Sequence, residues 1–172
     1  MDQTRPRGRL DLPVAFRDLP FGEQLMLWGV RLWVQALRDE GNVHDLLCRG
    51  FRLAGAPGAH PALDDLLTII ATTARGNVDI RCPRCRDISV DEHRLMGAVA
   101  AWQYQAGAVV ADTFLDAWLP PAGLRMARAP ASDLAAALRG AGLMIRPRRW
   151  VHHAPVHDGP PADPADPPAT LH

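Results

Sequence analysis

The turn Cys82-Pro83-Arg84-Cys85 is the motif in this chain with the clearest possible chemistry. Two cysteines at this spacing bring two thiolates within reach of one tetrahedral zinc ion. A closed zinc site takes four ligands, and the chain has a single such pair, so His93 and Cys48 are the candidate third and fourth ligands, with His44 as a substitute for Cys48 one helical turn away. Because one pair is an incomplete ligand set, we favour the simpler interpretation that these cysteines are ordinary structural residues. No cofactor is firmly implied, and zinc is the possible one.

The same two cysteines could instead work as a redox dithiol. A thiolate is stabilised when its cysteine sits at a helix N-terminus. Here the next helix start is Ser89, which comes after Cys85, and no βαβ pattern surrounds the motif. The neighbouring Arg81, Arg84 and Arg86 would favour the thiolate to some extent. The redox interpretation therefore ranks behind zinc binding.

No arrangement of catalytic residues can be recognised in the sequence. Asp91-Glu92-His93 contains residue types that are common in catalytic sites. However, consecutive helical residues point about 100° apart, so these side chains do not converge on one atom. Glu92 is explained by a capping box that Ser89 opens, and Asp91 by the positive end of the helix dipole. The chain lacks the nucleophile elbow, the His-Glu-x-x-His motif, the P-loop and the dinucleotide fingerprint. We therefore predict no catalytic residue, and an enzyme is not expected.

A basic run near the C-terminus, Arg146-Pro147-Arg148-Arg149-Trp150, could hold phosphates while its tryptophan stacks on a base. Arg146, Arg148, Arg149 and Trp150 are the candidate nucleic-acid contacts. However, the formal net charge is zero, and all 19 basic residues are arginine, as is typical of a GC-rich genome. Nucleic acid is therefore not the expected partner.

The element expected to position these residues is a helix from Pro20 to Glu40, the longest strongly patterned run. Apolar residues cover well over half of its circumference, which predicts burial by several neighbours. Arg31 falls on the remaining polar stripe, whereas Glu23 interrupts the apolar arc in the first turn. Gly29 lies inside the arc, where its small size lets another backbone approach.

Two aromatic residues of this helix are candidate interface residues. Trp28 falls inside the polar stripe, and Phe21 lies on the same side. Exposed aromatic side chains in such a position mark an interaction surface. The alternative is that a neighbouring segment covers both, and residues 10–19 could do so.

The rest of the chain predicts an all-α fold. Helical periodicity or start signals recur in residues 42–54, 61–74, 89–105, 109–119 and 132–140. Val78 to Ile80 and Leu143 to Ile145 could form short strands. We therefore predict five to six helices around the buried central helix at 20–40, with at most a minimal two-stranded ribbon. Residues 1–19 are expected to form an irregular N-terminal arm, 20–150 a single helical domain, and 151–172 a disordered proline-rich tail.

No segment resembles a secretion signal or a membrane span. The first residues lack an apolar core, and the longest uncharged run, Leu95 to Ala111, has 17 residues, whereas a span needs about 20. We expect a soluble cytoplasmic protein with no membrane partner. The predicted function is that of a small bacterial helical protein acting through protein–protein contacts, as an adaptor or regulator with a partner yet unknown. The alternative is a zinc-binding or redox-sensing module that uses Cys82 and Cys85.

Overall fold

The computed structural model describes residues 15–148, and the regular structure within that range is entirely helical. The elements are the 3-10 turn η1 (Phe16–Asp18), α1 (Phe21–Arg38), α2 (His44–Leu53), α3 (Ala59–Thr73), α4 (Val90–Gln103), α5 (Ala108–Leu115) and α6 (Pro121–Gly140). No strand is found between residues 15 and 148. The predicted all-α fold of five to six helices is therefore confirmed, with six helices in the described residues. The predicted disordered tail at 151–172 and most of the predicted arm lie outside the described residues.

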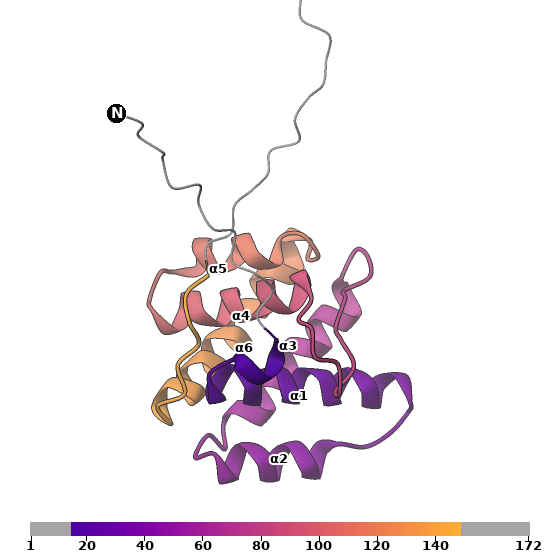
Figure 1. Ribbon diagram of the computed structural model, residues 1–172. Coiled ribbons are helices and arrows are strands. Elements are labelled where there is room, and N and C mark those ends of the chain that lie inside the picture. Colours follow the sequence, from indigo (N-terminus) through magenta and orange to yellow (C-terminus); the bar gives the residue numbers. More distant parts are fainter. Residues whose placement is uncertain (1–14, 149–172) are drawn as a thin grey trace, which may run out of the picture.

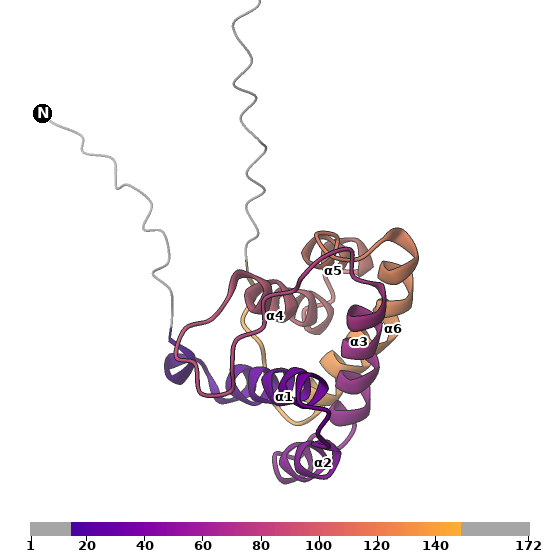
Figure 2. The same ribbon diagram turned by 90° about the vertical axis from the view of Figure 1, so that its right-hand side faces the viewer.

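The helices pack around one continuous hydrophobic core. α3 and α6 lie side by side, and α6 also packs on α4, which is covered by α5 (Figure 2). α1 packs on α3, and α2 runs beneath α1 in the view of Figure 1. The connection from α3 to α4 is a long non-helical segment, residues 74–89, that passes α1 before it reaches α4 (Figure 2).

α1 is packed against several neighbouring segments, as the width of its apolar arc predicts. Met26, Leu27 and Val30 have no exposed surface. A Cβ at Gly29 would lie 2.9 Å from Cδ2 of Leu63 in α3 and 3.0 Å from Cζ of Phe51 in α2. Both neighbouring helices therefore approach α1 at its glycine, which is the reason for a small residue there.

Two helices of the C-terminal half differ from the predicted ones. α5 ends at Leu115, earlier than the predicted 119. α6 begins at Pro121 and not near residue 132, because proline is well suited to the first helical position. Pro130 lies inside α6, where it removes one backbone hydrogen bond. Burial of Ala127 and Leu134 on either side of Pro130 holds the helix against that loss.

The minimal two-stranded ribbon, which the sequence allowed at most, does not form within the described residues, because side chains take the place of a neighbouring strand. The amide of Gln103 in α4 is almost fully buried and faces the segment after α6. Its Nε2 donates to the carbonyl oxygen of Leu143 at 3.0 Å, and its Oε1 accepts from the backbone N–H of Ile145 at 2.8 Å. One side chain thus satisfies the two backbone groups that a paired strand would have satisfied.

Candidate functional site: the Cys82–Cys85 loop

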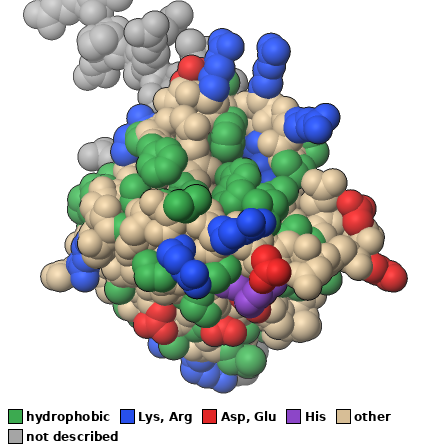
Figure 3. Space-filling model, turned by 90° about the horizontal axis from the view of Figure 1, so that it is seen from below, with side chains coloured by type: hydrophobic (Ala, Val, Ile, Leu, Met, Phe, Trp, Pro, Cys, Tyr) green, Lys and Arg blue, Asp and Glu red, His purple; other side chains and the backbone are tan. Residues whose placement is uncertain are grey.

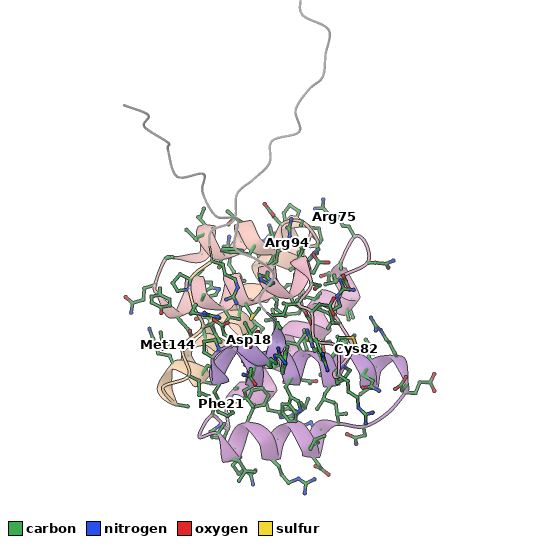
Figure 4. The ribbon with its side chains drawn as sticks, in the orientation of Figure 1. Asp18, Phe21, Arg75, Cys82, Arg94 and Met144 are labelled. Carbon is green, nitrogen blue, oxygen red and sulfur yellow. A yellow bond between two sulfur atoms is a disulfide. The ribbon has the colours of Figure 1, made fainter. Side chains whose placement is uncertain are left out.

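The cysteine turn lies in the connection between α3 and α4, beside α1 (Figure 4). Cys82 and Cys85 are joined by a disulfide, with their Cα atoms 5.1 Å apart. The backbone N–H of Cys85 donates to the carbonyl oxygen of Cys82 at 3.0 Å, which closes the turn. Cys82 is exposed and Cys85 is half-buried. The pair is therefore formed within one tight turn and is accessible to a reagent at Cys82.

A buried arginine from α1 fixes the backbone of this turn. The side chain of Arg31 has no exposed surface. Its Nη1 donates to the carbonyl oxygens of Cys85 at 2.7 Å and Cys82 at 3.4 Å, and its Nη2 donates to that of Asp87 at 2.8 Å. Three carbonyls of the loop thus converge on one guanidinium group.

Glu92, at the start of α4, balances the charge of this arginine. Nε of Arg31 lies 2.7 Å from Oε1 of Glu92 and Nη2 lies 2.8 Å from Oε2, in the two-pronged geometry that guanidinium and carboxylate favour. The carboxylate also accepts from the backbone N–H groups of Ser89 at 3.0 Å and Arg81 at 3.2 Å. All five donors of the guanidinium and the four acceptor positions of the carboxylate are occupied. The buried pair is therefore fully satisfied, which is the condition for tolerating two charges in a core.

An aromatic ring closes the remaining side of the guanidinium. The Phe16 ring of η1 lies with its centroid 4.8 Å from Cζ of Arg31, a cation–π contact. The backbone N–H of Phe16 donates to the carbonyl oxygen of Arg86 at 2.7 Å, which ties η1 to the loop.

The segment before the turn is held by side chains of α4 and not by a strand. The backbone N–H of Asp79 donates to Oδ2 of Asp91 at 2.8 Å, and the hydroxyl of Ser89 donates to the carbonyl of Asp79. Ser89 also accepts from the N–H of Glu92, so the predicted capping box is confirmed. The residues that cap α4 therefore also fix the chain leading to Cys82.

The other predicted zinc ligands lie in different environments. Cys48 is half-buried in α2, with Nη2 of Arg52 at 3.5 Å from its sulfur. His93 is half-buried, with Nδ1 3.1 Å from the carbonyl oxygen of Ser89, and burial lowers its pKa. Within residues 15–148, no group of three or more His, Cys, Asp or Glu side chains is arranged to hold a metal ion. The structure thus does not bring Cys82, Cys85, Cys48 and His93 together as one ligand set.

Two of the predicted nucleic-acid contacts bind a buried carboxylate instead. Nε of Arg146 lies 3.2 Å from Oε1 of Glu23, and Nη2 of Arg148 lies 3.0 Å from Oε2. The Glu23 side chain has no exposed surface. Burial on its own would raise the pKa of Glu23, but the hydrogen bonds from both arginines outweigh it and lower that pKa. Arg149 and Trp150 lie outside the described residues.

The two candidate interface residues have different surroundings. Trp28 is half-buried against α2, with its ring centroid 6.4 Å from that of Phe51 in an edge-on contact. Gly50 makes room for this indole, since a Cβ there would lie 2.6 Å from it. Phe21 is 62% exposed at the N-terminal end of α1 (Figure 4). α2 therefore covers Trp28, whereas Phe21 remains at the surface.

Sequence reasoning missed the polar residues that organise the site. Arg31 belongs to the polar stripe of the central helix, yet its side chain is buried against Glu92. Glu92 was explained by its cap alone. One usable signal was Glu23, a charge on an otherwise apolar arc, which indicates a buried partner. The Arg31–Glu92 pairing had no such signal, because these residues are 61 positions apart.

Comparisons with protein-family models, curated proteins and solved structures give no match. Among the helices in the described part of the chain, none has the length and apolar character needed to cross a membrane.

Proposed function

We propose that this protein is a small redox-responsive regulator whose sensing element is the Cys82–Cys85 pair. The observation that carries the proposal is the anchoring of the turn, since Arg31 bonds the carbonyl oxygens of both cysteines. Because Arg31 binds the backbone and leaves the sulfur atoms free, this anchoring does not depend on the redox state. The two thiols of the reduced form are thus held close enough to close again.

The chemistry follows from the different exposure of the two cysteines. The thiolate of a small external thiol attacks Sγ of the exposed Cys82, which forms a mixed disulfide and releases Cys85 as a thiolate. A second external thiolate attacks the external sulfur of that mixed disulfide and releases Cys82. The net reaction converts the protein disulfide and two external thiols into the dithiol and one external disulfide. In the reverse direction, Arg84 and Arg86 beside Cys85 favour the attacking thiolate.

The surroundings of the pair support sensing more than catalysis of disulfide exchange. Catalytic pairs lower the pKa of the attacking thiol at a helix N-terminus. Here α4 begins only at Val90, and its first turn is occupied by the capping box of Ser89 and Glu92. The pair therefore suits stoichiometric oxidation and reduction.

Trapping of thiols in the native host tests the proposal. A Cys48→Ser variant, in which Cys82 and Cys85 are the remaining cysteines, is exposed to diamide. Free thiols are then labelled with a maleimide reagent of high molecular mass. Cys82 and Cys85 should lose their free thiols together in diamide, and should regain them together after the oxidant is removed. A Cys82→Ser control should instead carry a mixed disulfide at Cys85. Cysteines that keep their free thiols in diamide, or that do not regain them after its removal, would contradict the proposed function.

A second candidate function is the adaptor role, and a groove beside the loop favours it. This groove of about 250 Å³ lies between α1, α3 and the segment that leads to Cys82. Trp33, Leu37 and Trp118 are among its apolar walls, and Leu37 is 58% exposed. Its volume suits one large apolar side chain of a partner protein, inserted as an anchor.

In-cell cross-linking separates this role from the redox role. The chain with Leu37→Asp is compared with Leu53→Asp, which changes a 90% exposed leucine on α2 away from the groove. A partner that uses the groove should be cross-linked to the wild type and to Leu53→Asp, and lost from Leu37→Asp. Equal cross-linking to all three chains, or none to any, would exclude the groove as the partner site.

A further inference from the structure

A second pocket lies on the far side of Trp33, where the C-terminal end of α1 meets the first turns of α2 and α3. Its volume is about 220 Å³. Trp33, Leu37, Val43 and Leu47 form its apolar walls, and polar side chains from α2 and α3 complete it. On the side of the molecule that α2 covers, a histidine lies at the surface against acidic side chains (Figure 3). The pocket is separate from the cysteine loop and takes no part in the redox proposal.

The pocket carries a single full charge, and this charge is negative. Asp64 of α3 is half-buried, and its Oδ1 accepts from the indole Nε1–H of Trp33 at 2.6 Å. Its Oδ2 has no hydrogen-bond donor among residues 15–148. Of the described residues that line the pocket, none is an arginine. The electrostatic complement of the pocket is therefore a cation.

Two histidines add an acceptor next to this carboxylate. His60 is only 5% exposed, and its ring centroid lies 4.3 Å from that of His44 in an edge-on contact. Its ring makes no hydrogen bond to a residue in the described range. Burial and the neighbouring His44 lower the pKa of His60, in spite of Asp64, which favours the neutral imidazole with one ring nitrogen as an acceptor. The ring nitrogens of His60 are therefore open to the pocket, where a ligand that donates a hydrogen bond can reach them.

The helix ends around the pocket do not make it an anion site. The N-termini of α2 and α3 would attract an anion if their N–H groups were free. However, the N–H of His44 donates to Oδ1 of Asn42 at 2.9 Å, and that of Ala59 donates to the carbonyl oxygen of Ala56 at 3.0 Å. Pro61, in the first turn of α3, has no N–H at all. These three positions offer no free donor, and Asp64 carries the one formal charge among the lining residues.

We propose that this pocket binds a small organic ammonium ion, with its N–H groups donating to Oδ2 of Asp64 and to the ring of His60, and its apolar stem lying against Trp33. Val43 and Leu47 cover the stem, so that a primary alkylammonium satisfies both the polar and the apolar parts of the lining.

Titration with three probes of the same shape tests the proposal on the full chain. n-Butylammonium, n-butanol and butyrate differ in charge but hardly in size. Butylammonium should bind saturably with a dissociation constant in the millimolar range, and should shift the NMR signals of the Trp33 indole N–H and the His60 ring. Butanol should bind at least about tenfold more weakly, because it lacks the charge that Asp64 pairs with. Absence of butylammonium binding, or butyrate binding of equal strength, would overturn the proposal.

Two matched variants identify the carboxylate. Asp64→Asn keeps an oxygen that can accept from Trp33, and should therefore fold normally while it weakens butylammonium binding at least about tenfold. Asp65→Asn removes the same charge from an exposed position on the same helix and should change the affinity little. Equal effects of the two variants, or none from Asp64→Asn, would show that Asp64 does not hold the ligand.

Discussion

The guanidinium group of Arg31 has three kinds of neighbour, namely a carboxylate, backbone carbonyls and an aromatic ring. Lysine could not replace it, because an ammonium group has three donors and no planar fork with which to bond Glu92 and the loop together. The interaction links α1, the cysteine turn and the start of α4 at one point. Its energy lies less in the pair itself than in the cost of leaving either charge alone in the core.

Glu92→Gln should therefore be strongly destabilising. It removes the charge but keeps the shape, and leaves the Arg31 cation uncompensated in the core. The free energy of unfolding should fall by about 3–5 kcal/mol, measured by urea denaturation. Asp112→Asn is the matched control, because it breaks the partly exposed pair with Arg128 and should cost far less. A similar loss of unfolding free energy in both variants would mean that the buried Arg31–Glu92 pair contributes no more to stability than the partly exposed pair.

Glu23 should make the stability of the fold depend on acid pH. Its pKa is lower in the folded chain than the ordinary value of 4.5, so the folded state binds the proton less readily than the unfolded state. The resulting stabilisation is complete above the unfolded pKa, and is lost as the pH falls through the folded pKa. Measured from about pH 6 to about pH 3, the free energy of unfolding should fall less steeply in Glu23→Gln than in the wild type.

A control for this pH dependence is Glu40→Gln, which removes an exposed carboxylate just after α1. Its pH profile should follow that of the wild type. A Glu23→Gln profile that also runs parallel to the wild type would show that Arg146 and Arg148 do not stabilise the ionised carboxylate.

At Gly29 of α1, two other helices converge on a single residue. Gly29→Leu would place a branched side chain where the ring of Phe51 and a methyl group of Leu63 already lie. Overpacking of this kind forces backbone shifts, and the free energy of unfolding should fall by about 2 kcal/mol or more. Gly140→Leu, at the end of α6 where a Cβ meets nothing within 4 Å, is the control and should cost little. An unchanged unfolding midpoint for Gly29→Leu would mean that α2 and α3 can move away from α1.

Helical elements were predictable from the sequence where local signals agree. The capping box at Ser89 fixed the start of α4, and the apolar arc fixed α1. The start of α6 was missed because a local start signal lies near residue 132, whereas the helix begins at Pro121 and continues through Pro130. The segments at Val78 to Ile80 and Leu143 to Ile145 were possible short strands, but their hydrogen-bond partners include the side chains of Gln103 and Asp91. Such partners come from distant parts of the chain, and no local pattern reports them.

At the scale of the whole molecule, one device recurs in the connections between helices. Each extended segment that the structure describes after α3 and α6 is held by buried polar side chains from α1 or α4. The carboxylate of Glu92 accepts a backbone hydrogen bond from the segment before the cysteines. The side chains of Gln103 and Glu23 accept backbone hydrogen bonds from the segment after α6. A helical protein without a sheet in its described part can thus satisfy backbone polar groups of its long connections with side chains. For the candidate site, the cysteines could be found from the sequence, but what holds them could not.

The equilibrium between the Cys82–Cys85 disulfide and glutathione, compared for the folded and the urea-unfolded chain, tests this account most directly. A Cys48→Ser background leaves only the pair to be titrated. If Arg31 holds the turn ready to close, the folded chain should favour the disulfide at least about tenfold more than the unfolded chain. By linkage, reduction should then lower the free energy of unfolding by at least about 1.4 kcal/mol. Equal equilibrium constants in the two states would contradict the account, because the fold would then contribute nothing to the pair.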